Sequence, residues 1–337
     1  MSVSIRKSNM ELLRLLSMAL VLVIHANTAY QPWPIDQTDV QAVPVHCFLR
    51  FLIESLCIVC VNAFVLLSGW FGIKFSLRRL LSFIFQVLFF SLILSFLPNH
   101  QGKRLIIDIV TLNQYWFVRA YIILFIISPA LNLLAEHAPK KVFQYVLVAF
   151  FVMQTVFSYI SNSSWFDDGF SPLPFIGLYL LSRYIRIYQP KFATFKKQVD
   201  LAVYLGVTVL LATLSVVLFK WFGTGGRMFN YTNPLVILSS VSFLLFFTKI
   251  KMKDNRVINW IAASSVGAYL LHMNPCFFQS YYIHTLQSFS RWDSSILICI
   301  AALVFMIAVF FAGVLLDKIR GLLWNGILNV SKNAKRV

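Results

Sequence analysis

Apolar runs recur along the whole chain, and they constrain its fold more than any other feature. Many are close to the roughly 20 residues that an α-helix needs to cross a bilayer. A membrane-spanning β-barrel would show short alternating segments instead. The sequence therefore predicts an all-α integral membrane protein with about ten transmembrane helices. We expect spans near residues 10–30, 48–70, 80–97, 115–135, 142–160, 172–189, 199–220, 233–249, 257–278 and 295–316.

The composition excludes the main soluble classes. Of the 337 residues, 59% are hydrophobic and 12% are charged, whereas about a quarter are charged in a soluble domain. A water-soluble enzyme, a disordered chain and a fibrous protein are therefore excluded. We expect residues 1–337 to form a single polytopic domain without an appended soluble domain. The first apolar run carries Glu11 and Arg14 and has no small-residue cleavage site, so it does not resemble a cleavable signal.

The net charge of +17 has a simple explanation in a membrane protein. In a soluble protein it would suggest a nucleic-acid partner, but cytoplasmic loops of membrane proteins also collect Lys and Arg. If both termini are cytoplasmic, 21 of the 29 basic residues fall inside and 6 fall outside. This bias favours an even number of spans, cytoplasmic N- and C-termini, and a lipid bilayer rather than nucleic acid as the partner.

Two features have structural as well as functional explanations. Cys57 and Cys60 have the spacing of a redox or zinc pair, but no second ligand pair accompanies them, so we expect packing residues and no metal site.

The expected outer loops at 31–47 and 161–171 are rich in polar and aromatic residues. Such loops suit a sugar-like ligand and also an aromatic belt at the membrane interface.

The first span carries polar groups that are costly in a bilayer. Glu11 and Arg14 are three residues apart, so they share a helix face and can pair. His25 follows Arg14 by eleven residues, which is close to three turns and about 16 Å along the axis. One face thus holds a cation towards the cytoplasm and an imidazole towards the outside. The structural alternative is a snorkelling Arg14 and a buried, hydrogen-bonded His25.

The ninth span holds a second histidine. Ser265, Tyr269 and His272 lie on one helix face, because they are separated by four and three residues. The small residues around them would let a neighbouring helix approach closely. His272 is therefore a candidate site residue, and a buried histidine with a purely structural hydrogen bond is an equal alternative.

The second and fourth spans carry shorter signals. The second ends in Ser68-Gly69, where backbone N–H groups can face a ligand, although such residues also simply end helices. The fourth begins with Trp116, which suits an interface anchor. Arg119 lies one turn further in, where a cation needs a partner or water.

These residues, taken in order, resemble the membrane-bound acyltransferase family 3, the integral membrane O-acyltransferases of bacterial surface glycans. The resemblance covers essentially the whole chain. Arg119 departs from the family pattern, which has a neutral residue there. Four motifs carry the resemblance: Arg14 to His25 in the first span, Phe64-Val-Leu-Leu-Ser68-Gly69 in the second, Tyr115-Trp116-Phe117 with Pro129 and Asn132 in the fourth, and Ser265-x-x-x-Tyr269-x-x-His272 in the ninth.

The resemblance implies a multi-pass enzyme of the bacterial inner membrane that acts on the cell envelope. It implies transfer of an acyl group, by default acetyl, from cytoplasmic acyl-CoA to a hydroxyl of a surface polysaccharide or lipid-linked saccharide. Acyl-CoA is then a substrate, and no cofactor is permanently bound. A sugar hydroxyl is scarcely ionised at neutral pH, so the reaction needs a base, and His25 fits that role beside Arg14 and Glu11.

The other expected site residues divide between the two substrates. Coenzyme A is anionic, and Arg183 and Arg186 lie near one face at the end of the sixth span, where they could meet its phosphates. Ordinary positive-inside charge explains the same residues equally well. The acyl-CoA-binding set is Ser68, Gly69, Lys74, Arg78, Arg79, Arg183 and Arg186, and the acceptor-side set is Trp116, Arg119, Tyr269 and His272.

The main alternative is a polysaccharide or lipid-linked sugar transporter or flippase, which would also need polar residues in its spans. The sequence shows no convincing internal repeat of the kind found in many transporters. A membrane protein for assembly or sensing, without chemistry, is a third interpretation. Hydrolysis or transfer of the acyl group of acyl-CoA by the purified protein separates the first interpretation from the other two.

Overall fold

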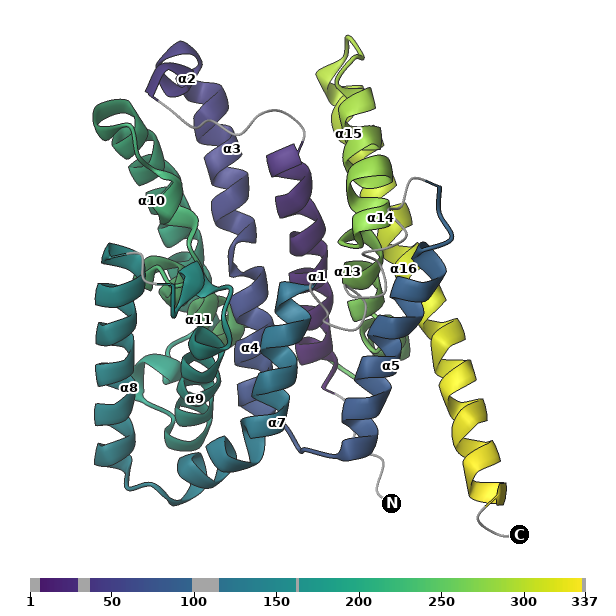
Figure 1. Cartoon of the computed structure of the whole chain (residues 1–337). Coiled ribbons are helices and arrows are strands. Elements are labelled where there is room, and N and C mark those ends of the chain that lie inside the picture. The colour runs from purple at the N-terminus through teal and green to yellow at the C-terminus, as the bar shows by residue number, and fades with distance from the viewer. Residues whose placement is uncertain (1–6, 30–36, 99–114, 162–163, 335–337) are drawn as a thin grey trace.

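The structure is a computed structural model that describes residues 7–29, 37–98, 115–161 and 164–334. Every regular element in these ranges is a helix, which confirms the predicted all-α class (Figure 1). The α-helices are α1 (Ser8–Ala29), α2 (Gln37–Ala42), α3 (Pro44–Cys57), α4 (Val59–Phe71), α5 (Leu77–Leu94), α7 (Trp116–His137), α8 (Lys140–Gln154), α9 (Pro172–Tyr188), α10 (Lys197–Phe222), α11 (Pro234–Thr248), α12 (Arg256–Ala262), α13 (Val266–His272), α14 (Pro275–Phe277), α15 (His284–Phe289) and α16 (Ser295–Ala334). Short 3₁₀ or π segments lie at η1 (Thr155–Ile160), η2 (Asp167–Gly169), η3 (Lys191–Thr194), η4 (Gly226–Phe229) and η5 (Phe278–Ile283).

Parts of the predicted loops fall outside the described residues. They include residues 31–36 and 162–163 of the expected outer loops. Five of the 29 basic residues counted for the orientation also lie outside the described ranges, namely Arg6, Lys103, Arg104, Lys335 and Arg336.

Eight segments of the described chain are long and apolar enough to cross a membrane. They match eight of the ten expected spans. The sixth expected span is α9, a helix of 17 residues. The ninth differs from the expectation of one helix over 257–278, because the structure divides this stretch into α12, α13, α14 and η5.

Local hydrogen bonds accompany the two breaks in the ninth span, and a proline accounts for the second. After α12 the hydroxyl of Ser265 donates to the carbonyl of Ala262 at 3.1 Å, in the turn that precedes α13. After α13 the side chain of Asn274 caps α14. Pro275 stands at the start of α14 and has no N–H to continue the preceding helix. The short α13 therefore ends with His272.

The first helix lies inside the bundle. It packs against α3, α4, α11, α12 and α13, and α4 in turn packs against α9 and α11. In Figure 1, α8, α9 and α10 lie on one side of α1, and α5 and α16 lie on the other. The start of α1 and the end of α16 are at the same end of the bundle, as an even number of spans requires (Figure 1). The assignment of that end to the cytoplasm stays a prediction.

The outer helices present apolar side chains away from the bundle. Only 11% of the apolar segment of α16 is buried inside the protein. Its exposed side chains include Leu303, Val304, Ile307, Phe311 and Leu315. A helix that is apolar on the face it does not pack is suited to lipid rather than water. The chain is therefore built as a multi-pass membrane protein.

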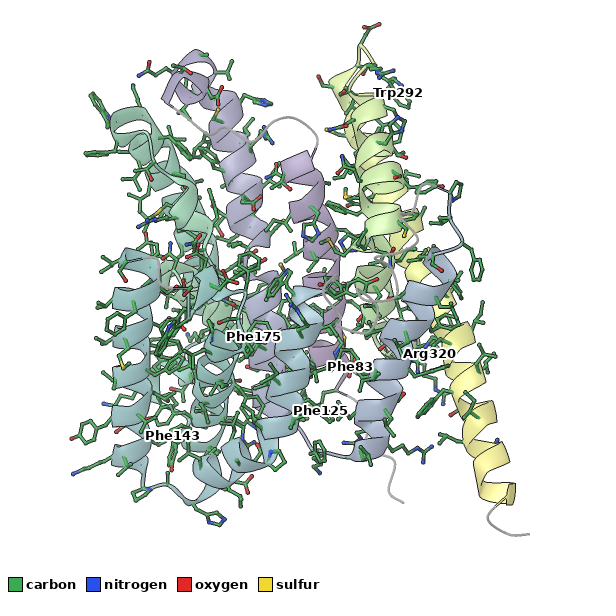
Figure 2. The ribbon with its side chains drawn as sticks, in the orientation of Figure 1. Phe83, Phe125, Phe143, Phe175, Trp292 and Arg320 are labelled. Carbon is green, nitrogen blue, oxygen red and sulfur yellow. The ribbon has the colours of Figure 1, made fainter. Side chains whose placement is uncertain are left out.

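A buried polar network joins α5 to α16. The Asp317 carboxylate accepts hydrogen bonds from Gln86 Nε2 at 2.7 Å and from Arg320 Nε at 2.9 Å. Arg320, which lies on the α5 side of α16 in Figure 2, also donates to Ser82 at 3.4 Å. The side chain of Asp317 is 1% exposed. An acid at this depth needs such partners, because an unpaired buried charge is strongly destabilising.

We predict that Asp317→Ala lowers the free energy of unfolding in detergent by about 3–5 kcal/mol, the usual effect of removing one partner of a buried ion pair. The change leaves the guanidinium of Arg320 and the amide of Gln86 without their acceptor. Asp293→Ala, at an exposed residue, is the control and should alter stability by less than about 0.5 kcal/mol. A wild-type unfolding transition for Asp317→Ala would contradict the prediction.

Candidate active site

Two histidines from distant parts of the chain meet inside the bundle. His25 Nδ1 on α1 lies 2.9 Å from His272 Nε2 on α13, although 247 residues separate them in sequence. His272 is completely buried. Its other ring nitrogen, Nδ1, lies 2.7 Å from the carbonyl oxygen of Ala268, one turn earlier on the same helix.

The Ala268 carbonyl determines where the protons of this pair lie. A carbonyl oxygen only accepts, so Nδ1 of His272 carries a hydrogen and donates it. Burial favours uncharged rings, so His272 Nε2 holds a lone pair and accepts from the Nδ1–H of His25. His25 is thereby left with a lone pair on Nε2, which bonds to no residue in the described part of the chain. This nitrogen can accept a proton.

Aromatic rings hold both imidazoles in place. Phe278 meets the His25 ring edge-on, with centroids 5.8 Å apart. The Tyr282 ring lies 5.4 Å from that of His272. Tyr282 is itself fixed by a hydrogen bond from its hydroxyl to the Leu22 carbonyl on α1, at 2.7 Å. These contacts restrict the rotation of the two rings and so favour a single orientation of the pair.

The imidazole of His25 lines a cavity of about 230 Å³. Side chains from α1, α3, α4, α7 and α13, and from the segments before α9 and α11, form its wall. Most of the wall is apolar. The groups that can make polar or aromatic contacts with a ligand include His25, Glu54, Trp116, Tyr231 and Tyr269.

The cavity includes a carboxyl group that the sequence reasoning did not select as a site residue. Glu54 on α3 is buried, and its Oε2 accepts a hydrogen bond from Asn27 Nδ2 at 2.8 Å. A signal was present, because an acidic residue inside an apolar span is rarely there without a function. Its partner Asn27 and its place in the wall of the cavity that His25 also lines follow from the packing of α1 against α3, which no local pattern indicates.

The motifs of the fourth and ninth spans also meet at this cavity. The Tyr115 hydroxyl donates to the Leu270 carbonyl at 2.9 Å and accepts from Asn274 at 2.8 Å. The rings of Tyr115 and Tyr269 are 5.8 Å apart. Tyr115 thus holds α13 against the start of α7, where Trp116 lines the cavity.

The predicted Glu11–Arg14 pair is confirmed. Arg14 Nη1 lies 2.7 Å from Glu11 Oε2. Neither residue lines the cavity around His25, which is consistent with the separation of about 16 Å that helix rise gives between Arg14 and His25. The structure therefore holds the pair on the same helix as His25 but away from the ring.

The residues expected to bind acyl-CoA lie at the C-terminal ends of α4 and α9, which pack together, and around the start of α5. Ser68 shares a hydrogen bond of 3.1 Å with Tyr121, and Gly69 gives room for close packing against α9. Arg183 pairs with Glu136 at 2.8 Å, whereas Arg186 lies over the ring of Trp70 at 4.9 Å from its centre. Lys74, Arg78 and Arg79 are exposed around the start of α5.

The acceptor-side residues fall into two groups. Trp116 and Tyr269 line the cavity, and His272 bonds directly to His25. Arg119 is exposed on α7 and does not line the cavity. The structure therefore brings His25, His272, Trp116 and Tyr269 together and leaves Arg119, Glu11 and Arg14 outside this group.

The comparison with known families decides the identity of the chain. The family model of the acyltransferase domain of acyltransferase family 3 matches residues 7–315. The chain belongs to acyltransferase family 3. No curated protein and no solved structure matches it. The protein is thus a multi-pass membrane acyltransferase, and the matched range includes both histidines of the pair.

We predict that both histidines of this acyltransferase are neutral near pH 7 and carry their hydrogen on Nδ1. The reason is that His272 Nδ1 must donate to the Ala268 carbonyl, which leaves His272 Nε2 to accept from His25 Nδ1. Nuclear magnetic resonance of ¹⁵N-labelled histidine measures this directly, since protonated and unprotonated ring nitrogens resonate apart. Replacing the six histidines one at a time with Gln assigns the signals. A protonated Nε2 on His25 would contradict the proposed donor order.

Proposed function

We propose that this acyltransferase moves an acyl group, most simply acetyl, from cytoplasmic acyl-CoA to a hydroxyl of a surface or lipid-linked glycan, with His25 as general base. The observation that carries the proposal is the lone pair on His25 Nε2, in a ring that lines a cavity and is fixed by His272. A general base needs an unprotonated nitrogen in reach of the reacting hydroxyl, and a fixed ring supplies one.

In the proposed reaction, His25 Nε2 accepts the proton of the acceptor hydroxyl while the hydroxyl oxygen attacks the thioester carbon. The new C–O bond forms and the C–S bond breaks. The departing sulfur takes the proton back from His25, so the products are an ester and the free thiol of coenzyme A. His272 acts as a positioning residue, because it holds the donor Nδ1–H of His25 throughout.

Aromatic rings around the base suit a carbohydrate acceptor. Trp116 and Tyr231 both line the cavity, and their rings lie 6.0 Å apart. Flat apolar faces pack against the C–H surfaces of a sugar ring, and a few polar groups then fix its orientation. The outer loop with Asp167 and Asp168 precedes α9 and lies at the end of that helix opposite Arg186.

The donor is proposed to bind at the other end, where cations are exposed. Lys74, Arg78 and Arg79 would attract the phosphates of coenzyme A. Arg183 and Arg186, three residues apart on α9, would add two guanidinium groups.

The remaining proposals are a single domain over residues 1–337, a location in the bacterial inner membrane, and acyl-CoA as a substrate rather than a resident cofactor.

We predict that His25→Ala lowers the rate of acyl transfer by at least about 100-fold, since loss of a general base typically costs 10²–10⁴-fold. The measurement is transfer of radiolabelled acetyl from acetyl-CoA by purified protein to an envelope fraction from the source strain lacking the gene. His284→Ala is the matched control, because His284 is exposed on α15 and does not line the cavity.

Two results would count against this proposal in different ways. If His25→Ala keeps more than about a tenth of the wild-type rate, His25 is not the base, given the usual size of the effect. If the wild-type protein neither transfers nor hydrolyses the acyl group of acetyl-CoA, the donor assignment fails and the transporter interpretation gains support.

We also predict that the two substrates act from opposite faces of the membrane. The donor is anionic and exists in the cytoplasm, and the predicted inner loops collect basic residues. In reconstituted vesicles of known orientation, acetyl-CoA should work only from the face that bears Lys196 and Lys197. The acceptor should work only from the face that bears Asp167 and Asp168. Full activity with both substrates confined to the inner face would overturn this sidedness and leave the acyltransferase assignment intact.

A further inference from the structure

Glu54 shares the cavity with the proposed base. It lies on α3, its exposed fraction is 6%, and its side chain forms part of the wall that His25 also lines. A carboxyl group at this depth in a membrane protein is costly, so it is normally held by partners and usually has a function. The structure shows how it is held.

A short network fixes Glu54 through one of its two oxygens. Asn27 Nδ2 donates to Glu54 Oε2 at 2.8 Å and to the Arg50 carbonyl at 3.1 Å. Arg50 Nη2 donates in return to the Asn27 carbonyl at 2.7 Å. Asn27 lies two residues after His25 on α1, so the helix that carries the base also carries the group that orients the carboxylate.

The second oxygen of Glu54 is in a different situation. Oε1 accepts no hydrogen bond from the described residues. It is also not among the fully enclosed polar atoms that lack a partner, so part of its surface is accessible. In a purely structural role both oxygens of a buried carboxylate would be satisfied by the protein. Here Asn27 holds one oxygen, and the other accepts no hydrogen bond from the described residues, on a side chain that lines the cavity.

The available oxygen selects the chemistry of its ligand. A carboxylate oxygen only accepts, so the ligand must donate a hydrogen. The Arg50 guanidinium, one turn earlier on α3, belongs to the same network through the Asn27 carbonyl, so a cation already lies near Glu54. A neutral donor such as a hydroxyl is therefore favoured over an ammonium group or a metal ion.

We propose that Glu54 Oε1 accepts a hydrogen bond from a second hydroxyl of the acceptor, close to the hydroxyl that His25 deprotonates. The inference rests on the proposed function and narrows it to acceptors with at least two neighbouring hydroxyls, as on a sugar ring. Glu54 is then a specificity-determining residue that touches the substrate but takes no proton. Such a contact is present before and during the reaction, so it acts on acceptor binding rather than on the chemical step.

The test is Glu54→Gln in the purified full-length protein, with acetyl-CoA and an envelope fraction from the source strain lacking the gene. Initial rates are measured while each substrate is varied in turn. Hydrogen bonds to a charged group are worth enough that their loss should raise the acceptor KM about 10- to 100-fold. The KM for acetyl-CoA and kcat should stay within about threefold, because neither depends on this contact.

Three controls keep the result interpretable. Asp293→Asn also removes one negative charge, at an exposed residue, and should leave all kinetic constants unchanged. Glu54→Asp keeps the charge but withdraws the oxygens by one methylene, so it should also raise the acceptor KM. The unfolding temperature and an unchanged KM for acetyl-CoA show that each variant is folded.

The remaining outcomes overturn the proposal. An acceptor KM that rises less than about tenfold in Glu54→Gln shows that the carboxylate does not bind the acceptor. A loss of kcat larger than the rise in acceptor KM shows a role in the chemical step instead. Absence of transfer by the wild-type protein, or full activity of His25→Ala, would be a failure of the proposed function and is recognised without the Glu54 variants.

Discussion

The hydrogen bond between His25 and His272 is the contact on which the candidate site depends. It joins α1 to α13, and its direction is set by the Ala268 carbonyl at the far side of His272. A side chain whose orientation is fixed by a second one and then by the backbone loses little freedom when a substrate binds. The divided ninth span serves this arrangement, since α13 ends at His272 and places its ring beside α1.

The other buried polar groups also lie in an environment of low dielectric constant, where they need hydrogen-bond partners. Polar side chains inside the bundle are costly unless they are paired, so each pair also fixes two helices relative to each other. Asn27 with Glu54 ties α1 to α3, and Gln86 with Asp317 ties α5 to α16. The first of these pairs leaves a carboxylate oxygen at the cavity, whereas the second is enclosed by Arg320 as well. In the proposal above, this difference separates Glu54, which binds the acceptor, from Asp317, which has a structural role.

Local pattern explains what could be predicted from the sequence. Apolar runs of sufficient length predicted the helices, and the three-residue spacing predicted the Glu11–Arg14 pair, because both depend on neighbours along one helix. Periodicity also placed His25 and His272 on polar faces, but it does not say which faces meet across 247 residues. Glu54 was visible as a charge in an apolar span, and its place in the cavity required the packing of α1 on α3.

Position within the membrane gives the site a chemical advantage that a surface pocket would lack. In the proposed reaction, water competes with the sugar hydroxyl for the thioester, because the base that activates one can activate the other. The cavity around His25 is lined mainly by apolar side chains such as Met18, Val21 and Phe64, and apolar walls offer water few hydrogen-bond partners. Exclusion of water also strengthens the few polar contacts that remain. An acceptor held by aromatic faces and a fixed carboxylate would thus compete with water by position, and transfer would be favoured over hydrolysis.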